Sequence, residues 1–186
     1  MKRLLLVLLV AAIAIPTFQS CKKGPNDPAI SLKSRKARLV GEWTLSSGTI
    51  TQNAGTQVVY TFNGSTVSYS TGGSVNYTET VTIVKDGTYK SVVLDDGDMS
   101  TDEGQWYFMG ANKDNDIKNK ECVAFVITKR TYTPAGGTTI VSTWTSTNPD
   151  FAWRLDELKS KELIVTIDET SSSPSSTTGT YTFTKK

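Results

Sequence analysis

The chain has 186 residues, of which 37% are hydrophobic and 20% charged, with a formal net charge of +2 and no histidine. Without histidine it cannot form the usual Ser-His-Asp or Cys-His nucleophilic sites, nor any histidine metal site. We therefore expect no enzyme and no cofactor, and the length indicates one domain after a short leader.

The N-terminus has the pattern of a secretory signal peptide. Lys2 and Arg3 precede twelve apolar residues, Leu4 to Ile15, and a membrane-spanning helix needs about 20. A charged start followed by a short apolar run is typical of a signal peptide, predicted here over residues 1–20. Ala12-Ile13-Ala14 fits an ordinary signal peptidase, which would leave Cys21 a plain thiol.

The alternative is cleavage directly before Cys21. Ser20, a small residue, precedes this cysteine, and a polar stretch rich in Lys, Gly, Pro and Asn follows it up to Pro28. This arrangement resembles the cleavage region of bacterial lipoproteins, although Phe18 and Gln19 replace the usual aliphatic and small residues. The resemblance implies a diacylglycerol, with acyl chains such as palmitate, on Cys21 and the lipid bilayer as partner. In such lipoproteins an aspartate directly after the cysteine favours retention in the inner membrane. Lys22 occupies this position here, which favours the outer membrane, on its periplasmic or its surface face.

Residues 21–38 are predicted to be a flexible basic tether. They carry six bases and one acid, Asp27, whereas the chain from Leu39 onward carries 12 bases and 17 acids. A basic stem below an acidic body argues against nucleic-acid binding. It suits a position near anionic lipid headgroups, and a solvated linker is the alternative. Residues 31–38 are predicted to include a short helical turn.

From Gly41 onward the sequence predicts short strands separated by turns. Asn63-Gly64 and Asp86-Gly87 each join two alternating runs, the pattern of a β-hairpin. Strands are predicted at 41–50, 58–62, 65–69, 81–85, 88–94, 105–109, 123–133, 138–145, 151–155, 163–169 and 178–186, and polar loops at the barrel ends at 95–104 and 110–119. We therefore predict an all-β, antiparallel up-and-down meander, closed into a β-barrel of about 8–10 strands because closure removes free edges.

The first predicted strand begins with Leu39-Val40-Gly41-Glu42-Trp43. Gly-x-Trp at this position resembles the lipocalin signature. Together with the signal peptide and a final Tyr-x-Phe-x-Lys at 181–185, the chain resembles the lipocalin-like domains of bacterial envelope lipoproteins over roughly residues 36–186. The resemblance implies a lipocalin-like barrel over 39–186, a monomer, and Gly41 and Trp43 as its barrel-closing signature. It also implies that a base near the last strand covers Trp43, for which Arg154, Lys185 and Lys186 are the candidates.

Such a barrel is expected to bind a small apolar or amphipathic molecule. The candidate pocket-lining residues are Tyr60, Phe62, Trp106, Phe125, Trp144, Trp153, Tyr181 and Phe183. The alternative is that these aromatic side chains fill the barrel. In that case the lipoprotein would be structural, contacting another envelope protein or a glycan through its end loops.

Two further features concern metal and thiol chemistry. Asp95, Asp96, Asp98 and Asp102 are the candidate calcium ligands, because carboxylate oxygens at this density suit a hard cation, and a solvated acidic loop is the alternative. The second cysteine, Cys122, lies in an apolar strand-like run. It is predicted to be a small buried core residue.

Overall fold

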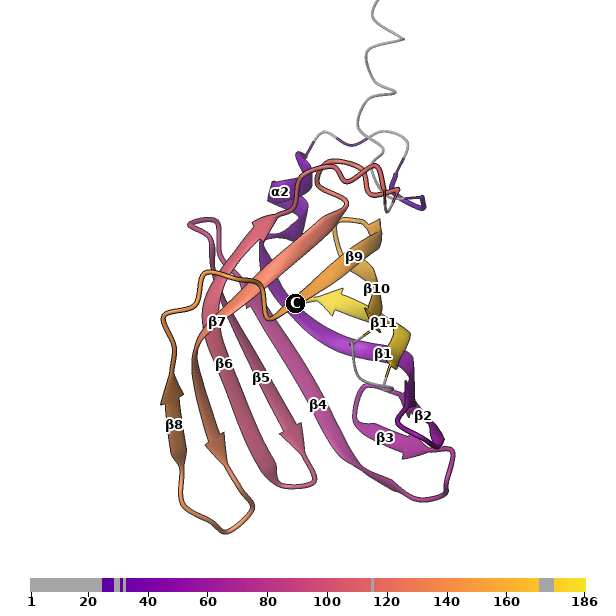
Figure 1. Cartoon of the computed structure of the whole chain (residues 1–186), viewed down its shortest axis with the longest axis vertical. Helices are drawn as coiled ribbons and strands as arrows, with labels where there is room; N and C mark the ends of the chain where they lie inside the picture. The colour runs from indigo at the N-terminus through magenta and orange to yellow at the C-terminus, as the bar shows by residue number, and fades with distance from the viewer. Residues whose placement is uncertain (1–24, 29–30, 32, 115, 171–175) are drawn as a thin grey trace, which may run out of the picture.

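The computed structural model describes residues 25–28, 31, 33–114, 116–170 and 176–186. In these residues it contains one short helix and eleven strands (Figure 1). The elements are α2 (Arg35–Leu39), β1 (Gly41–Asn53), β2 (Gln57–Phe62), β3 (Thr66–Tyr69), β4 (Ser74–Ile83), β5 (Thr88–Asp95), β6 (Asp98–Phe108), β7 (Cys122–Thr133), β8 (Ile140–Thr143), β9 (Phe151–Leu158), β10 (Glu162–Thr170) and β11 (Ser176–Lys185). The predicted all-β class and the short N-terminal helical turn are confirmed.

The strands form an antiparallel meander that closes into a barrel of ten strands. β1 pairs with β11 on one side and with β4 on the other, while β7 joins β6 to β9, so that the hydrogen-bonded circuit is complete. The β2–β3 hairpin is inserted between the far halves of β1 and β4. Among the described residues β8 pairs with β7 alone and adds an eleventh strand beside the barrel.

The barrel has two structurally different ends (Figure 1). We call one the helix end, at the top of the figure: it consists of α2, the β4–β5 turn (84–87), the β6–β7 loop (109–121) and the β9–β10 turn (159–161). The opposite, hairpin end consists of the turns at 54–56, 70–73, 96–97 and 134–139. The predicted loop 110–119 thus lies at a barrel end, as expected.

The prediction of a loop at 95–104 is wrong. Most of it belongs to β6, and the connection from β5 is a two-residue turn of Asp96 (φ 48) and Gly97 (φ 94). Positive φ at both central residues is the geometry that favours Asp-Gly in tight hairpins. The predicted turns at Asn63-Gly64 and Asp86-Gly87 are confirmed, with φ of 90 and 100 at the two glycines.

The segment predicted as a flexible tether is fixed to the barrel where it is described. Asp27 is buried, and its carboxylate lies 3.4 Å from the Arg35 guanidinium and 3.6 Å from that of Arg38. The same carboxylate accepts the backbone N–H of Leu158 at 2.8 Å. α2 begins at an N-cap, Ser34, whose hydroxyl accepts the Ala37 N–H. The tether prediction is therefore wrong for Asp27 and α2, and residues 21–24 lie outside the described residues.

No helix in the described part of the chain is both long and apolar enough to cross a bilayer. The predicted signal peptide and Cys21 lie outside this part. Cys122 is buried and unpaired, as predicted. Burial raises the pKa of its thiol, which keeps the thiol in its neutral, unreactive form.

Candidate functional site

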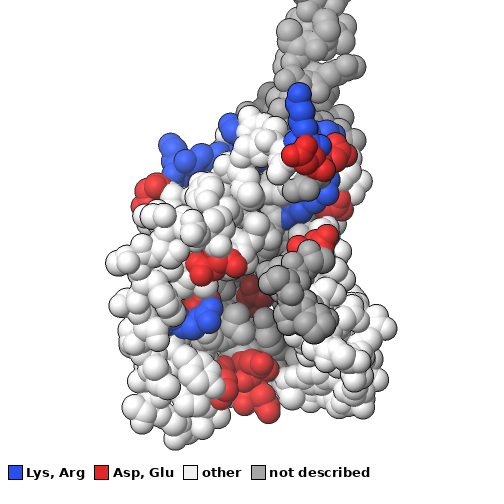
Figure 2. All heavy atoms as spheres, viewed as in Figure 1, with Lys and Arg blue, Asp and Glu red and all other residues white. Residues whose placement is uncertain are grey.

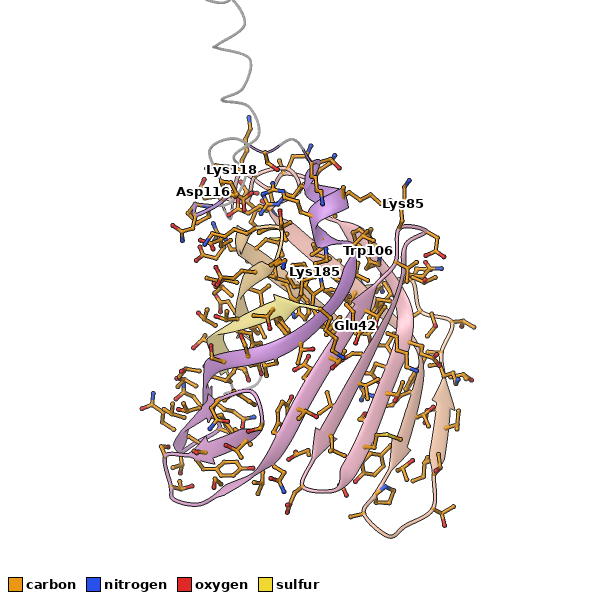
Figure 3. The ribbon with its side chains drawn as sticks, turned by 180° about the vertical axis from the view of Figure 1, so that it is seen from behind. Glu42, Lys85, Trp106, Asp116, Lys118 and Lys185 are labelled. Atoms are coloured by element: carbon orange, nitrogen blue, oxygen red, sulfur yellow. The ribbon has the colours of Figure 1, made fainter. Side chains whose placement is uncertain are left out.

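The helix end of the barrel is closed by Trp43 and Lys185. The Lys185 ammonium lies 4.8 Å from the centre of the Trp43 ring, below α2 (Figure 3). It donates hydrogen bonds to the backbone carbonyls of Arg38 and Val40, while the Trp43 indole N–H donates to the Leu39 carbonyl at 2.7 Å. The base that covers Trp43 is therefore Lys185 and neither Arg154 nor Lys186. Both other candidates pair elsewhere, with Glu121 and Glu42 respectively.

Gly41 makes this closure sterically possible. Its φ is +142, and a Cβ atom at this position would lie 2.2 Å from Cε of Lys185. Only glycine leaves room for the lysine stem here and adopts this φ without strain. The Gly-x-Trp signature thus has a physical role in the barrel closure.

The half of the barrel next to this closure is filled with side chains. Trp153 contacts Phe125 and Phe183, with ring centroids 4.7 and 5.2 Å apart, and Phe151 stacks on Phe125 at 4.8 Å. The largest fully buried side chains are Trp43, Phe125, Phe183, Leu39, Leu45, Ile83, Leu155, Leu158, Leu163, Val81, Val123 and Val165. This half is a packed core, so the aromatic residues in it contribute to stability and leave no room for a ligand.

The half towards the hairpin end is different, and we call its interior the chamber. A cavity of about 410 Å³ lies there, lined by Val93, Asp95, Asp98, Ser100, Arg130 and Tyr132. A second cavity of about 340 Å³ shares Arg130 with it and is lined also by Ile127, Trp144, Asp150 and Phe151. Figure 2 shows the hollow, with acidic side chains deep inside it and along its lower rim.

One wall of the chamber is polar and charged. Arg130 forms two hydrogen bonds with the Asp102 carboxylate, at 2.6 and 2.7 Å, across the β6–β7 pair. Further towards the hairpin end, Asp98 accepts the Tyr132 hydroxyl and the Ala135 N–H. Both bonds stabilise the ionised carboxylate, and they lower the pKa of Asp98.

Glu79 and Tyr77 lie between this wall and an aromatic cluster. In the β4–β5 register Glu79 lies opposite Val93, and the Tyr77 hydroxyl donates to the Glu79 carboxylate at 3.2 Å. Removal from water raises the pKa of Glu79 to about 7, only partly offset by the hydrogen bond from Tyr77. The Tyr77 ring packs edge-on against Phe62 at 4.9 Å, and Phe62 packs against Tyr181 at 5.3 Å.

The Tyr89 hydroxyl lies at the boundary between the core and the chamber. Its ring packs against Phe125 in the core, and the side chain is only 3% exposed. Among the described residues the buried hydroxyl has no hydrogen-bond partner. Burial raises the pKa of the Tyr89 hydroxyl, and the negative charges of Asp102 and Asp150 raise it further. A buried hydroxyl without a partner costs free energy until a polar atom reaches it.

The barrel wall beside the chamber is not hydrogen-bonded throughout. β7 bonds β9 over Cys122–Phe125 but β8 over Lys129–Tyr132. β10 pairs with β9 only up to Thr166, and no pairing in the described part of the chain joins β8 to the remainder of β10. The hydrogen bonding of the barrel wall is therefore interrupted between these two strands.

The predicted pocket-lining residues fall into three groups. Phe125, Trp153 and Phe183 belong to the packed core, and Trp106 is also buried, donating its indole N–H to the Val84 carbonyl beneath Lys36 of α2. Tyr60, Phe62 and Tyr181 form an aromatic cluster with Tyr69, whose ring lies 5.4 Å from that of Tyr60; this cluster packs with the core and lines neither cavity. Trp144 is 45% exposed and lies after β8, at the edge of the second cavity.

The four candidate calcium ligands do not gather around one point. Asp95, Asp96 and Asp98 surround the β5–β6 turn, while Asp102 forms an ion pair with Arg130. No group of three or more potential ligand residues suited to a metal ion occurs among the described residues. The geometry therefore offers no support for a calcium site here.

Sequence reasoning missed the polar residues of the chamber: Glu79, Arg130, Tyr132, Asp150 and the Tyr89 hydroxyl. Polar residues in strands are normally taken to face water outside the sheet. One signal was available. Asp96-Gly97 is a second Asp-Gly pair, and recognising its hairpin would have placed Asp98, Ser100 and Asp102 on one face of a strand.

No protein family matches the chain, and no curated protein is detectably similar to it. Among solved structures, the crystal structure of Rv2717c from M. tuberculosis matches 81% of this chain and 94% of its own length, at 12% identity and a TM-score of 0.31. A match this distant carries no argument about function. The closed antiparallel barrel is consistent with the lipocalin-like fold expected from the sequence.

Proposed function

We propose that this protein is a lipid-anchored, non-enzymatic lipoprotein of the bacterial envelope that binds a small amphipathic molecule in the chamber. The supporting observation is the contrast between the two halves of the barrel. One half is filled by its own side chains, whereas the other contains cavities of about 410 and 340 Å³. These volumes are in the range of small-molecule sites.

The chamber walls favour an amphipathic ligand over a purely apolar one. The apolar part of the molecule would lie against Ile127, Trp144 and Phe151 of the second cavity. Its polar part would face the charged wall, where Asp95, Asp98 and Arg130 line the first cavity. Because carboxylates outnumber bases on that wall, a hydrogen-bond donor or a positively charged group is the best complement.

Mass spectrometry of protein gently extracted from its host envelope tests both parts of the proposal. We expect an acylated N-terminal Cys21 and a co-purified small molecule released on denaturation. An unmodified Cys21 would remove the anchor, and an empty protein that also binds no amphipath from an envelope extract would remove the ligand.

Two variants, one with a bulky side chain inside the chamber and one with it outside, then test whether the ligand binds in the chamber. Val93 faces the chamber, whereas its neighbour Val92, opposite Thr101 on β6, faces the other side of the sheet. Val93→Trp should fill the cavity and abolish ligand retention, and Val92→Trp should retain the ligand. Equal retention by the two variants would exclude the chamber as the site.

A second candidate function is contact with another envelope protein. Residues 134–149 contain no charge and include Ile140, Val141 and Trp144, which are 58%, 57% and 45% exposed. An uncharged edge strand with exposed apolar side chains is open to pairing with another chain. A photo-crosslinker at position 140 should then capture a defined partner in intact envelopes, while one at position 92 should not.

A further inference from the structure

The charged residues in the turns and loops of the barrel are segregated between its two ends. The described turns at the hairpin end contain one acid, Asp96, and no lysine or arginine. At the helix end, seven exposed lysines form no ion pair within the described part of the chain: Lys33, Lys36, Lys85, Lys113, Lys118, Lys120 and Lys161. Figure 3 labels Lys85 and Lys118 on opposite sides of this end.

The acids at the helix end do not cancel these lysines. Asp27 and Glu121 are buried in ion pairs with arginines, and Glu42 pairs with Lys186. Only three exposed acids in the loops of this end are without a basic partner in the described residues: Asp86, Asp114 and Asp116. The helix end is thus a positively charged face, and the chamber lies away from it.

The docked N-terminal segment places this face close to the point of attachment. Asn26 is bonded to Asp156 through its backbone N–H at 3.2 Å and its side chain at 3.1 Å, and Asp27 to Leu158. Cys21 precedes Asn26 by five residues, which span at most about 18 Å when fully extended. A flexible tether up to residue 38 would have allowed the barrel to move away, but a tether that ends at Asn26 does not.

We infer that the helix end of the barrel is a docking surface for anionic phospholipid headgroups. The inference rests on the anchor at Cys21 in the proposed function and adds an orientation: the barrel stands on its helix end, with the chamber facing away from the bilayer. At physiological ionic strength a charge acts over about 8 Å, so lysines held this close to a surface are attracted to it. Each base near an anionic leaflet strengthens the attraction about fivefold.

The test uses protein purified with its acyl group and placed in two kinds of vesicle, phosphatidylcholine alone and phosphatidylcholine with phosphatidylglycerol. Amide hydrogen exchange is followed in the helix-end loops 84–87 and 109–121 and in the hairpin-end turns 70–73 and 134–139. On the anionic vesicles we expect several-fold slower exchange in the helix-end loops alone. In about 1 M salt, where the Debye length is near 3 Å, this protection should disappear.

Two double variants with the same change of charge provide the control. Lys85→Gln with Lys118→Gln removes two bases from the docking surface and should abolish most of the several-fold protection on anionic vesicles. Lys90→Gln with Lys129→Gln removes two bases from the barrel wall, where both residues flank Glu103 in register, and should leave protection unchanged. Equal protection on both kinds of vesicle, or equal loss in both variants, would overturn the inference.

Failure of the anchor is distinguishable from failure of the docking surface. If mass spectrometry finds no acyl group, the protein is coupled to a maleimide lipid through Cys21, which is selective because the other cysteine, Cys122, is buried. Protection of the helix-end loops on anionic vesicles then supports the docking surface without the natural anchor. No protection in this coupled form would refute the docking surface itself.

Discussion

Lys185, the second-last residue, covers the ring of Trp43 at the start of the first strand, with its ammonium 4.8 Å from the ring centre. This contact joins the first and the last strand of the barrel, because β1 and β11 are neighbours with Trp43 opposite Lys185. The ammonium also donates hydrogen bonds to the backbone carbonyls of Arg38 and Val40, just before β1. Burial lowers the pKa of Lys185, so the cation is kept in place by these contacts against the cost of its desolvation.

Lys185→Met should therefore destabilise the protein by about 2–3 kcal/mol. The change removes a cation–π contact and charged hydrogen bonds to two carbonyls, while it keeps most of the apolar stem. Lys186→Met is the matched control, because Lys186 pairs with Glu42 on the surface and should contribute less than about 1 kcal/mol. Urea unfolding measures both, and equal losses would contradict the closing role of Lys185.

Gly41→Ala should cost about 2–4 kcal/mol, because the new methyl group meets the Lys185 stem and the φ of +142 strains any other residue. Gly55→Ala, at a positive φ with nothing within 4 Å, should cost about 1 kcal/mol. In a Lys185→Ala background the Gly41→Ala penalty should fall, since the two side chains no longer collide. Strict additivity of the two changes would show that the collision is not the cause.

The sequence predicts the fold best where strands cover the packed core. Val123, Phe125 and Ile127 alternate with residues of the other face and mark β7 clearly, and Asn-Gly and Asp-Gly mark the turns. β6 was missed over Asp98–Gly104 because both of its faces meet water, one outside and one in the chamber. A strand between two wet faces has no apolar alternation to reveal it.

Glu79 makes stability depend on pH. Its pKa in the folded protein is about 7, above the ordinary value of 4.5. The folded state then holds a proton that the unfolded chain has released, so the stabilisation is full below about pH 4.5 and is lost as the pH rises through 7. Because the side chain keeps some contact with water, screening reduces the effect to about 1–2 kcal/mol.

The Glu79→Gln variant should lose this pH dependence and be more stable than the parent at pH 8. The Glu103→Gln control should behave oppositely, since the hydrogen bond from Lys129 lowers the pKa of Glu103 and its stabilisation is lost as the pH falls. Denaturant titrations between pH 4 and pH 8 measure both. An unchanged pH profile in Glu79→Gln would show that this carboxyl is not the titrating group.

The sequence predicts the candidate site only in part, because an aromatic residue in a strand does not reveal which half of the barrel it faces. Phe125 and Tyr132 are both aromatic residues of β7, but Phe125 is buried in the core and Tyr132 lines the chamber. Their positions along the barrel axis depend on strand register, which the bulge between Glu103 and Gly104 shifts by one residue. No local sequence feature encodes that shift.

Substitutions of Trp153 and Trp144 test the division of the barrel into a packed core and a chamber. Trp153→Ala should cost about 3–5 kcal/mol, because the ring fills the core between Phe125 and Phe183. Trp144→Ala should change stability by less than about 1 kcal/mol and reduce ligand retention, since Trp144 lies at the edge of a cavity. Thermal unfolding together with ligand release gives both values, and a large stability loss for Trp144→Ala would place it in the core.

Asp27 controls how firmly the N-terminal segment is held. Its side chain is 0% exposed and is paired with two buried arginines. Asp27→Asn leaves Arg35 and Arg38 without their counter-ion, and removing one partner of a buried ion pair typically costs about 3–5 kcal/mol. The segment is then expected to detach from β9, since water satisfies the two arginines better than an amide does.

Asp156→Asn is the control, because it makes the same chemical change beside Asn26 and keeps the backbone hydrogen bond between the two residues. Limited proteolysis should cut Asp27→Asn at Lys33, Arg35 or Lys36 before the barrel unfolds, and should leave Asp156→Asn intact. On anionic vesicles the detached segment lengthens the tether, so protection of the helix-end loops should decrease in Asp27→Asn alone. Resistance of both variants to the protease would mean that other contacts hold the segment to the barrel.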